Sequence, residues 1–136
     1  MKWVTVIIGL MLAGVGLGDE TSLYQRLGGE KGVQTIAERL IDHSSEHPET
    51  RRSFDKVDLV KLKQSLATQL CELSEGPCRY QGDDMRRVHK GLGISEREFY
   101  AMVEHLRVIL DDMAIDTRSK NQLLAKLAPM KKDVVE

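Results

Sequence analysis

Apolar side chains recur at every third or fourth position in four separate stretches, and this spacing most constrains what the chain can fold into. The stretches are Val33, Ile36, Ala37, Leu40 and Ile41; Leu59, Leu62, Leu66, Leu70 and Leu73; Phe99, Met102, Val103, Leu106, Ile109, Leu110 and Met113; and Leu123, Leu124, Leu127 and Met130. Such spacing gathers apolar residues on one face of an α-helix, and no stretch alternates as a half-buried strand would. The sequence therefore predicts an all-α fold.

Residues suited to helix ends stand between these stretches. The predicted N-caps are Ser22 and Ser95, each with a capping-box partner three residues later, Asp58, and either Asp83 or Asp84. Gly28-Gly29 is predicted to end a short first helix, and the second helix is expected to stop before the polar residues 43–48. Phe54 is expected in a loop. Pro129 lacks a backbone donor and should kink or divide the last helix.

The first residues form a separate hydrophobic segment. Residues 3–13 are nearly all apolar, follow Lys2, and lead into three glycines before the first acid, Asp19. This layout predicts a signal peptide over residues 1–18, a mature domain over residues 19–136, and a periplasmic or secreted location with no stable membrane insertion after cleavage. An uncleaved anchor is the weaker alternative, because a membrane-spanning helix needs ~20 residues, and a buried first helix is weaker still.

The composition fits one small domain and excludes one class of partner. The 136 residues are 41% hydrophobic and 30% charged, which suits a single core. With 20 basic and 21 acidic residues the formal net charge is -1, so no excess positive charge is present to attract nucleic acid or acidic lipid. We expect no nucleic-acid partner, and we expect a monomer.

Two cysteines leave two interpretations open. Cys71 and Cys78 flank the turn-forming run Ser-Glu-Gly-Pro, which could bring the two thiols together. In an oxidising compartment they would form a disulfide. The other interpretation is a pair of free thiols, one of them packed on a helix, and the sequence favours neither.

The most specific motif is the string YQGDDMRRVHKGLGI over residues 80–94. Together with Leu27-Gly28-Gly29 and the isolated Phe54, it resembles bacterial group I truncated globins. In that family a pair of glycines closes a short first helix, and an M-x-x-x-H-x-G-x-G-I string carries the ligand to a haem iron. The resemblance covers about residues 22–135. It implies a truncated globin fold, a two-on-two helical sandwich around one haem.

The resemblance implies that His89 is the axial iron ligand, and the physics of the string is consistent with this role. Haem iron needs a neutral imidazole nitrogen on a short, rigid element, with the other ring nitrogen held by a hydrogen-bond acceptor. Met85 lies one turn earlier on the same face, and Gly91 and Gly93 allow a close backbone turn. The remaining histidines are expected to be structural or exposed: His43, His47 and His105.

Further pocket residues follow from the resemblance. Phe54 matches the aromatic residue that stacks against the haem. The other residues expected to contact the cofactor are Ile41, Leu62, Leu66, Tyr80, Met85, Val88, Ile94, Phe99, Met102 and Leu127. Ordinary core packing would explain most of the same residue types, and the two roles are compatible.

The side of the pocket that would face a bound gas departs from the family pattern. Group I members usually carry a tyrosine late in the second helix and one or more glutamines on the following long helix. The matching positions here are Leu40-Ile41, Leu62 and Leu66. Losing a charge-assisted hydrogen bond to dioxygen forfeits roughly 1.5 to 3 kcal/mol, which argues against high-affinity oxygen storage. Gln69 is either a replacement donor or a polar residue lining a tunnel.

Three functions are consistent with these residues. The favoured one is a haem protein that reversibly binds dioxygen, carbon monoxide or nitric oxide, with haem b as cofactor because no C-x-x-C-H sequence for thioether attachment is present. The alternative is a haem enzyme of low activity on nitric oxide or peroxide, served by an unidentified reductase. The lack of a distal Tyr, His or Arg argues against it. A helical interaction module without haem is disfavoured by the retained string.

Overall fold

The computed structural model describes residues 21–136, and every regular element in this part of the chain is a helix, as predicted. The elements in order are α1 (Leu23–Arg26), α2 (Gly29–Glu46), the 3-10 helix η1 (Arg51–Phe54), α3 (Leu59–Leu73), α4 (Met85–His89), α5 (Glu96–Asp112), α6 (Thr117–Leu127), the 3-10 helix η2 (Ala128–Met130) and α7 (Lys131–Val134). The predicted signal peptide lies outside the described residues. Within the described range, no helix is long and apolar enough to cross a membrane.

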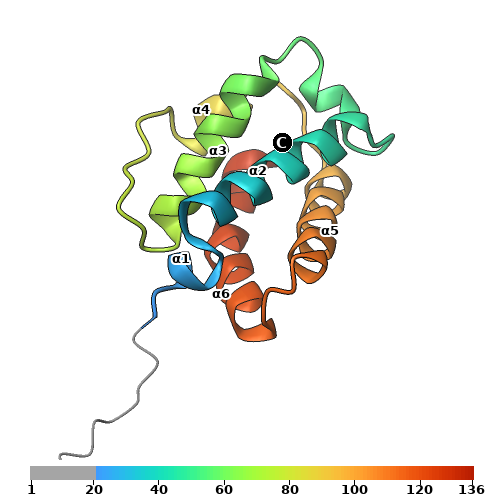
Figure 1. The fold of residues 1–136 in the computed structure, drawn as a ribbon. Coiled ribbons are helices and arrows are strands. Elements are labelled where there is room, and N and C mark those ends of the chain that lie inside the picture. The colour runs from blue at the N-terminus through green and yellow to red at the C-terminus, as the bar shows by residue number, and fades with distance from the viewer. Residues whose placement is uncertain (1–20) are drawn as a thin grey trace, which may run out of the picture.

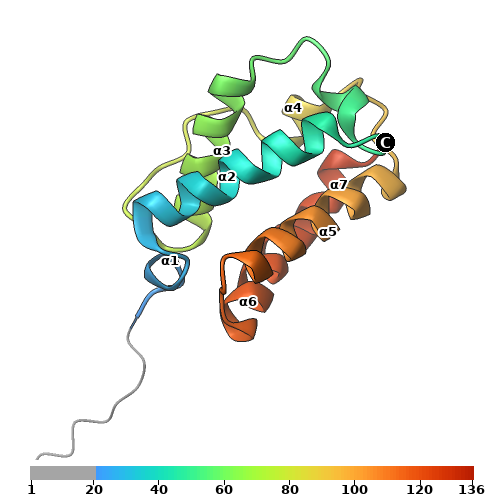
Figure 2. The same ribbon diagram turned by 45° about the vertical axis from the view of Figure 1, so that its right-hand side comes forward.

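The long helices are arranged around α2. In Figure 1, α2 lies between α3 and α5 and packs against both of them. Figure 2 shows α5 and α6 side by side as a second pair. The short helix α1 contacts α2 and α6, and α4 packs against α7. The segment that carries His89 therefore rests on residues from the last part of the sequence.

The predicted apolar stripes meet in one core. Each of the four long helices contributes side chains that are buried almost completely: Val33, Ile36, Leu40, Leu70, Leu106, Leu110 and Leu123. Burying a side chain of this size stabilises the folded state by roughly 1.5 to 3 kcal/mol. The core thus holds α2, α3, α5 and α6 in place, and the shorter elements are attached around it.

The corner between α1 and α2 depends on glycine. Gly28 has a φ of 99°, in the left-handed region, and it is the N-cap of α2. One turn later the helix passes so close to α1 that a Cβ on Gly32 would lie 1.9 Å from the backbone oxygen of Leu27. The glycine pair therefore turns the chain, and Gly32 lets the two helices approach.

Most predicted helix ends are confirmed. Both capping boxes, at Ser22 and Ser95, are present with the reciprocal bonds that define them. Asp58 caps α3 and Asp84 caps α4, each accepting from a backbone amide in the first turn. Pro129 divides the last helical stretch, because α6 ends at Leu127 and a 3-10 turn follows.

Two predictions about local structure were wrong. The second helix does not stop before residue 43 but continues to Glu46, and His47, whose backbone is extended, precedes Pro48. A residue before proline is disfavoured in the helical region, so the proline and not the polar composition ends this helix. Phe54 lies in the 3-10 helix η1 rather than in a loop. An element of four residues is too short to show an apolar period.

Cys71 and Cys78 form a disulfide, with their Cα atoms 5.7 Å apart. Cys71 is buried in the last turn of α3, and Cys78 follows in the loop. Gly76 donates from its backbone amide to the Cys71 carbonyl at 2.8 Å, and this bond closes the turn between them. The bridge therefore ties the start of the loop before α4 to the core.

Removing this bridge is expected to lower the free energy of unfolding by about 2 to 3 kcal/mol, because the unfolded chain regains the entropy of a short closed loop. The variant is Cys71→Ala/Cys78→Ala, compared with the oxidised parent by urea denaturation. Reduction of the parent should give a similar loss, and a reducing agent should leave the variant unchanged. Equal stability of parent and variant would contradict the prediction.

Candidate functional site

His89 lies at the end of the short helix α4. Asp84 begins this helix by accepting the backbone amide of Arg87 at 2.9 Å. The helix ends after five residues, and the turn that follows carries Gly91 and Gly93 with φ values of 82° and 59°. These left-handed conformations favour glycine, so the sequence itself limits α4 to little more than one turn.

The ring of His89 is held in one tautomer. Its Nδ1 lies 2.8 Å from the backbone oxygen of Met85, in a partly buried contact. A carbonyl can only accept, so Nδ1 carries the proton and donates, which leaves Nε2 unprotonated in the neutral ring. Metal-bound histidines usually donate their other ring nitrogen in this way. Nε2 of His89 is therefore an atom that is able to bind a metal ion.

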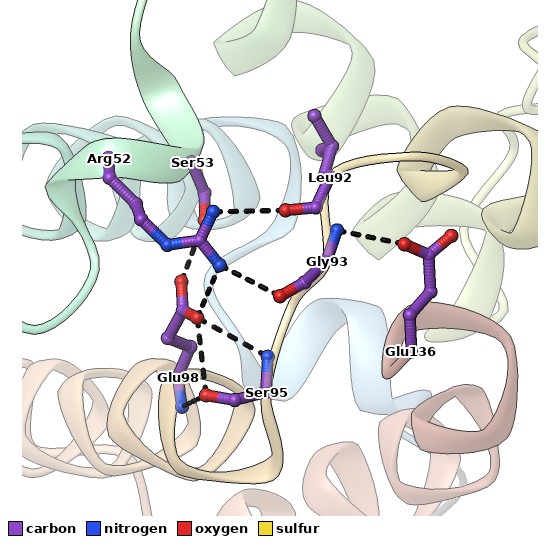
Figure 3. A network of polar contacts seen from close by, with 7 residues as sticks. All are labelled: Arg52, Ser53, Leu92, Gly93, Ser95, Glu98 and Glu136. Atoms are coloured by element: carbon purple, nitrogen blue, oxygen red, sulfur yellow. Dashed lines mark hydrogen bonds and ion pairs between the residues drawn. The ribbon is translucent and has the colours of Figure 1, made fainter.

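The loop after His89 is held from two sides (Figure 3). Arg52, in η1, donates to the carbonyl oxygens of Leu92 and Gly93 at 3.0 and 2.8 Å. Glu136 accepts from the amides of Gly91 and Gly93, both at 2.8 Å. The loop backbone thus has partners for both its donors and its acceptors. This arrangement restricts the motion of the segment that positions His89.

Glu98 connects Arg52, one of the two residues that hold this loop, to α5. Its carboxylate forms an ion pair with Arg52 at 2.6 Å and accepts from Ser53 at 3.1 Å, while it also completes the Ser95 capping box. Burial tends to raise the pKa of Glu98, but hydrogen bonds from Arg52, Ser95 and Ser53 outweigh it and lower the pKa overall. One carboxylate therefore links η1, the loop and the start of α5.

Acid is expected to weaken this link. Because the pKa of Glu98 is lower in the folded state than in the unfolded state, its stabilising effect is complete above the unfolded pKa and is lost as the pH falls through the folded one. Glu98→Gln should therefore destabilise the protein most near neutral pH, and the difference should shrink from about pH 6 to about pH 3. Urea denaturation across this range measures it, with the exposed Glu38→Gln as control. A constant difference at every pH would contradict the prediction.

The residues expected to contact the cofactor come from α2, η1, α3, α4, α5 and α6 and from two loop positions, and they differ in exposure. Ile41 and Ile94 are buried, at 1% and 7% exposed. Leu66, Met102 and Leu127 are partly buried and pack against the main core. The side chains that remain half-buried are Phe54, Leu62, Tyr80, Met85 and Phe99, and Val88 is 43% exposed. Apolar side chains that are only partly covered are consistent with a flat apolar cofactor, and their contact with it stays a prediction.

Tyr80, a member of this set, and Gln69, which contacts another member, both have definite polar partners. The amide of Gln69 lies 3.4 Å from the sulfur of Met85, so α3 and α4 are connected one turn before His89. The hydroxyl of Tyr80 donates to the backbone oxygen of Asp83 at 2.9 Å. Burial, with Asp83 and Asp84 nearby, raises the pKa of Tyr80, which keeps the phenol protonated at neutral pH.

Sequence reasoning missed the two residues that hold the loop after His89. Arg52 and Glu136 lie about 40 residues from that loop on either side in the sequence, and both make their contacts on the surface. A surface arginine and a surface glutamate carry no local pattern, so no signal in the single sequence could have found them. The string around His89 was found because all its parts lie within a few residues.

Comparison with known proteins assigns the family. The family model for bacterial-like globins matches residues 22–136, which is most of the chain. The chain belongs to this globin family. Membership implies haem as the cofactor and a diatomic gas as its ligand. The short helix, the oriented His89 and the two glycines lie within the matched range.

Two relatives of this globin are distant from it in sequence. It is 24% identical over 111 residues to the Group 1 truncated hemoglobin GlbN of Nostoc commune, which covers 82% of this chain and 94% of the relative. It is 23% identical to the GlbN protein of Mycolicibacterium paratuberculosis, with 91% of each chain covered.

Solved structures confirm the predicted fold. The truncated hemoglobin of Tetrahymena pyriformis in its Fe(III) form matches with a TM-score of 0.80 at 22% identity, covering 85% of this chain and 98% of that one. The 2/2 hemoglobin of Synechococcus, which carries a covalently attached heme, matches with a TM-score of 0.79 at 23% identity. This globin therefore has the two-on-two helical fold of truncated haemoglobins.

Proposed function

We propose that this globin is of the group I type and reversibly binds a diatomic gas at a haem iron held by His89. The observation that carries the proposal is the hydrogen bond between His89 Nδ1 and the Met85 carbonyl, which leaves Nε2 free on a short, capped helix. Haem, when bound, supplies the iron that takes the gas. Arg52 and Glu136 hold the loop that follows, and so keep the ligand in position.

The residues on the other side of the proposed pocket favour ligands that need no hydrogen bond. Structures of the Tetrahymena pyriformis protein include variants at one tyrosine and two glutamines. The spacing of those three positions is the spacing of Ile41, Leu62 and Leu66 here. All three side chains in this globin are aliphatic and offer no donor. We infer that it binds carbon monoxide readily and releases dioxygen quickly.

The experiment that tests this function is addition of haemin to the purified protein, followed by reduction and exposure to carbon monoxide. One haem per chain and a carbon monoxide difference spectrum are expected. Failure to take up haem, or a spectrum identical to that of free haemin, would overturn the proposal and favour an interaction module without haem.

We further propose that the cofactor is haem b, held without a covalent bond. Both cysteines of the described chain are joined in the disulfide and cannot form thioethers. Acid acetone extraction should then remove all the colour from the protein. Haem that stays with the chain would indicate covalent attachment, as in the Synechococcus structure.

Export to an oxidising compartment is also a proposal. The Cys71–Cys78 disulfide supports it, because such bonds form and persist outside the reducing cytosol. The apolar run before Asp19 gives the second argument. Mass spectrometry of the protein recovered from the producing cell should show a chain that begins near Asp19, and an intact residue 1 would contradict cleavage.

A further inference from the structure

Three histidines outside the haem-binding set form a cluster. His43 and His47 lie one turn apart at the end of α2, and His105 lies on α5. The ring centroids of His43 and His47 are 4.4 and 4.7 Å from that of His105. One possible ligand atom from each residue lies within 4.8 Å of the others. The sequence predicts structural or exposed residues at these positions, and the packing of α2 on α5 brings them together.

The cluster has a fixed side and an adaptable side. His105 is 9% exposed, and its Nδ1 lies 3.1 Å from the hydroxyl of the fully buried Ser44. Thr50 in turn donates to the Ser44 carbonyl at 2.6 Å. The Ser44 hydroxyl can accept from Nδ1, and in that tautomer Nε2 of His105 is unprotonated and available. His43, in contrast, is exposed and free to change rotamer.

The surroundings of His105 favour the neutral form of its ring. Burial lowers the pKa of His105, and the neighbouring His43 and His47 lower it further, while Glu49 and Glu104 act in the opposite sense. Glu49 already pairs with Arg97 at 3.6 Å, and Glu104 pairs with Arg107 at 3.7 Å. Both arginines lie on α5. A neutral imidazole is the form that binds a metal ion.

We propose that His43, His47 and His105 bind one divalent transition-metal ion, Zn²⁺ in the first instance, with water in the fourth position. Imidazole suits zinc, and three histidines with one open position form a known type of zinc site. Tetrahedral bonds of about 2.0–2.1 Å bring the ligand nitrogens to roughly 3.4 Å from one another. The cluster therefore closes by about an ångström when the metal binds, and the exposed His43 accommodates most of this shift.

Metal binding at the cluster would replace one surface hydrogen bond and join two helices. The amide of Glu49 donates to His47 Nδ1 at 3.2 Å on the surface, and metal binding replaces this exposed contact. The ion would join the end of α2 to the middle of α5, which strengthens a packing contact already present. The site does not involve His89, so zinc binding is independent of the haem proposal.

The test is a zinc titration of the purified protein, without a histidine tag and both with and without added haem, in competition with a fluorescent zinc chelator. One Zn²⁺ per chain is expected, with a rise in the melting temperature. His43→Gln and His47→Gln, which change partly exposed side chains, should each weaken binding at least about tenfold and abolish that rise. Glu38→Gln, an exposed change earlier on α2, is the matched control and should bind zinc as the parent does.

Each outcome of this titration decides the proposal. The absence of stoichiometric zinc binding would overturn it, and so would binding that both histidine variants retain. The Soret band and the circular dichroism spectrum of every variant report whether it is folded. His105→Gln, which alters the buried ring, serves as a third variant where these spectra match those of the parent.

Discussion

Replacing His89 by alanine is expected to leave the chain folded but unable to retain haem. The side chain is only partly buried and its one hydrogen bond is to the Met85 carbonyl, so little of the core depends on it. Iron, in contrast, would lose its protein ligand. Loss of an outer partner alone costs 10- to 100-fold in metal affinity, so we expect haem affinity to fall by at least about 100-fold. Haem per chain is measured by the pyridine haemochrome assay after gel filtration.

His43→Ala provides the matched control, because it removes an exposed histidine from a different helix. It should keep one haem per chain. Added imidazole should restore part of the haem binding of His89→Ala, because the free molecule can take the place of the missing iron-binding ring without being attached to the protein. Normal haem content and an unchanged spectrum in His89→Ala would show that another residue binds the iron.

Placing a tyrosine at position 41 is expected to slow dioxygen release by about tenfold or more, if the new hydroxyl donates a hydrogen bond worth roughly 1.4 kcal/mol. Ile41 is buried, at 1% exposed, and lies late in α2. Carbon monoxide carries little charge, so its dissociation should change much less. Stopped-flow measurements of both dissociation rates, on the parent and on Ile41→Tyr, test this.

Ile41→Phe is the control for this second prediction, because it adds the bulk of the ring without the hydroxyl. It should leave dioxygen release fast. Slow release from the unaltered protein would reveal a donor already present, and Gln69→Leu would then test the amide that contacts Met85. No slowing in Ile41→Tyr would show that position 41 does not face the bound gas.

The elements that sequence reasoning located correctly are those defined by contacts over a few residues. A capping box such as that of Ser95 joins atoms three positions apart, and Pro129 acts on its own helix. The polar residues before Pro48 predict an earlier end for α2 than the structure shows. Helices on a surface tolerate such residues, and the backbone restriction at Pro48 decided the boundary instead.

The candidate site also combines contacts over a few residues, which the sequence predicts, with contacts between distant parts of the chain, which it does not. The string that contains His89 is local, and the hydrogen bond to Met85 joins residues one helical turn apart. The partners of the loop after it, Arg52 and Glu136, come from distant parts of the chain and gave no signal. The histidine cluster lies between these cases. His43 and His47 had the spacing of one helix face, but only the packing of α2 on α5 shows that His105 joins them.

The hydrogen bonds that Glu136 accepts from Gly91 and Gly93 couple the local unfolding of two segments. Because α7 packs against α4, and Glu136 lies two residues after the end of α7, residues 131–136 and the His89 loop are expected to unfold as one cooperative unit. Anything that binds His89 lowers the population of the open form and so protects both segments together. In hydrogen exchange, the amides of α7 should then slow when the cofactor is added, although none of them is expected to touch it.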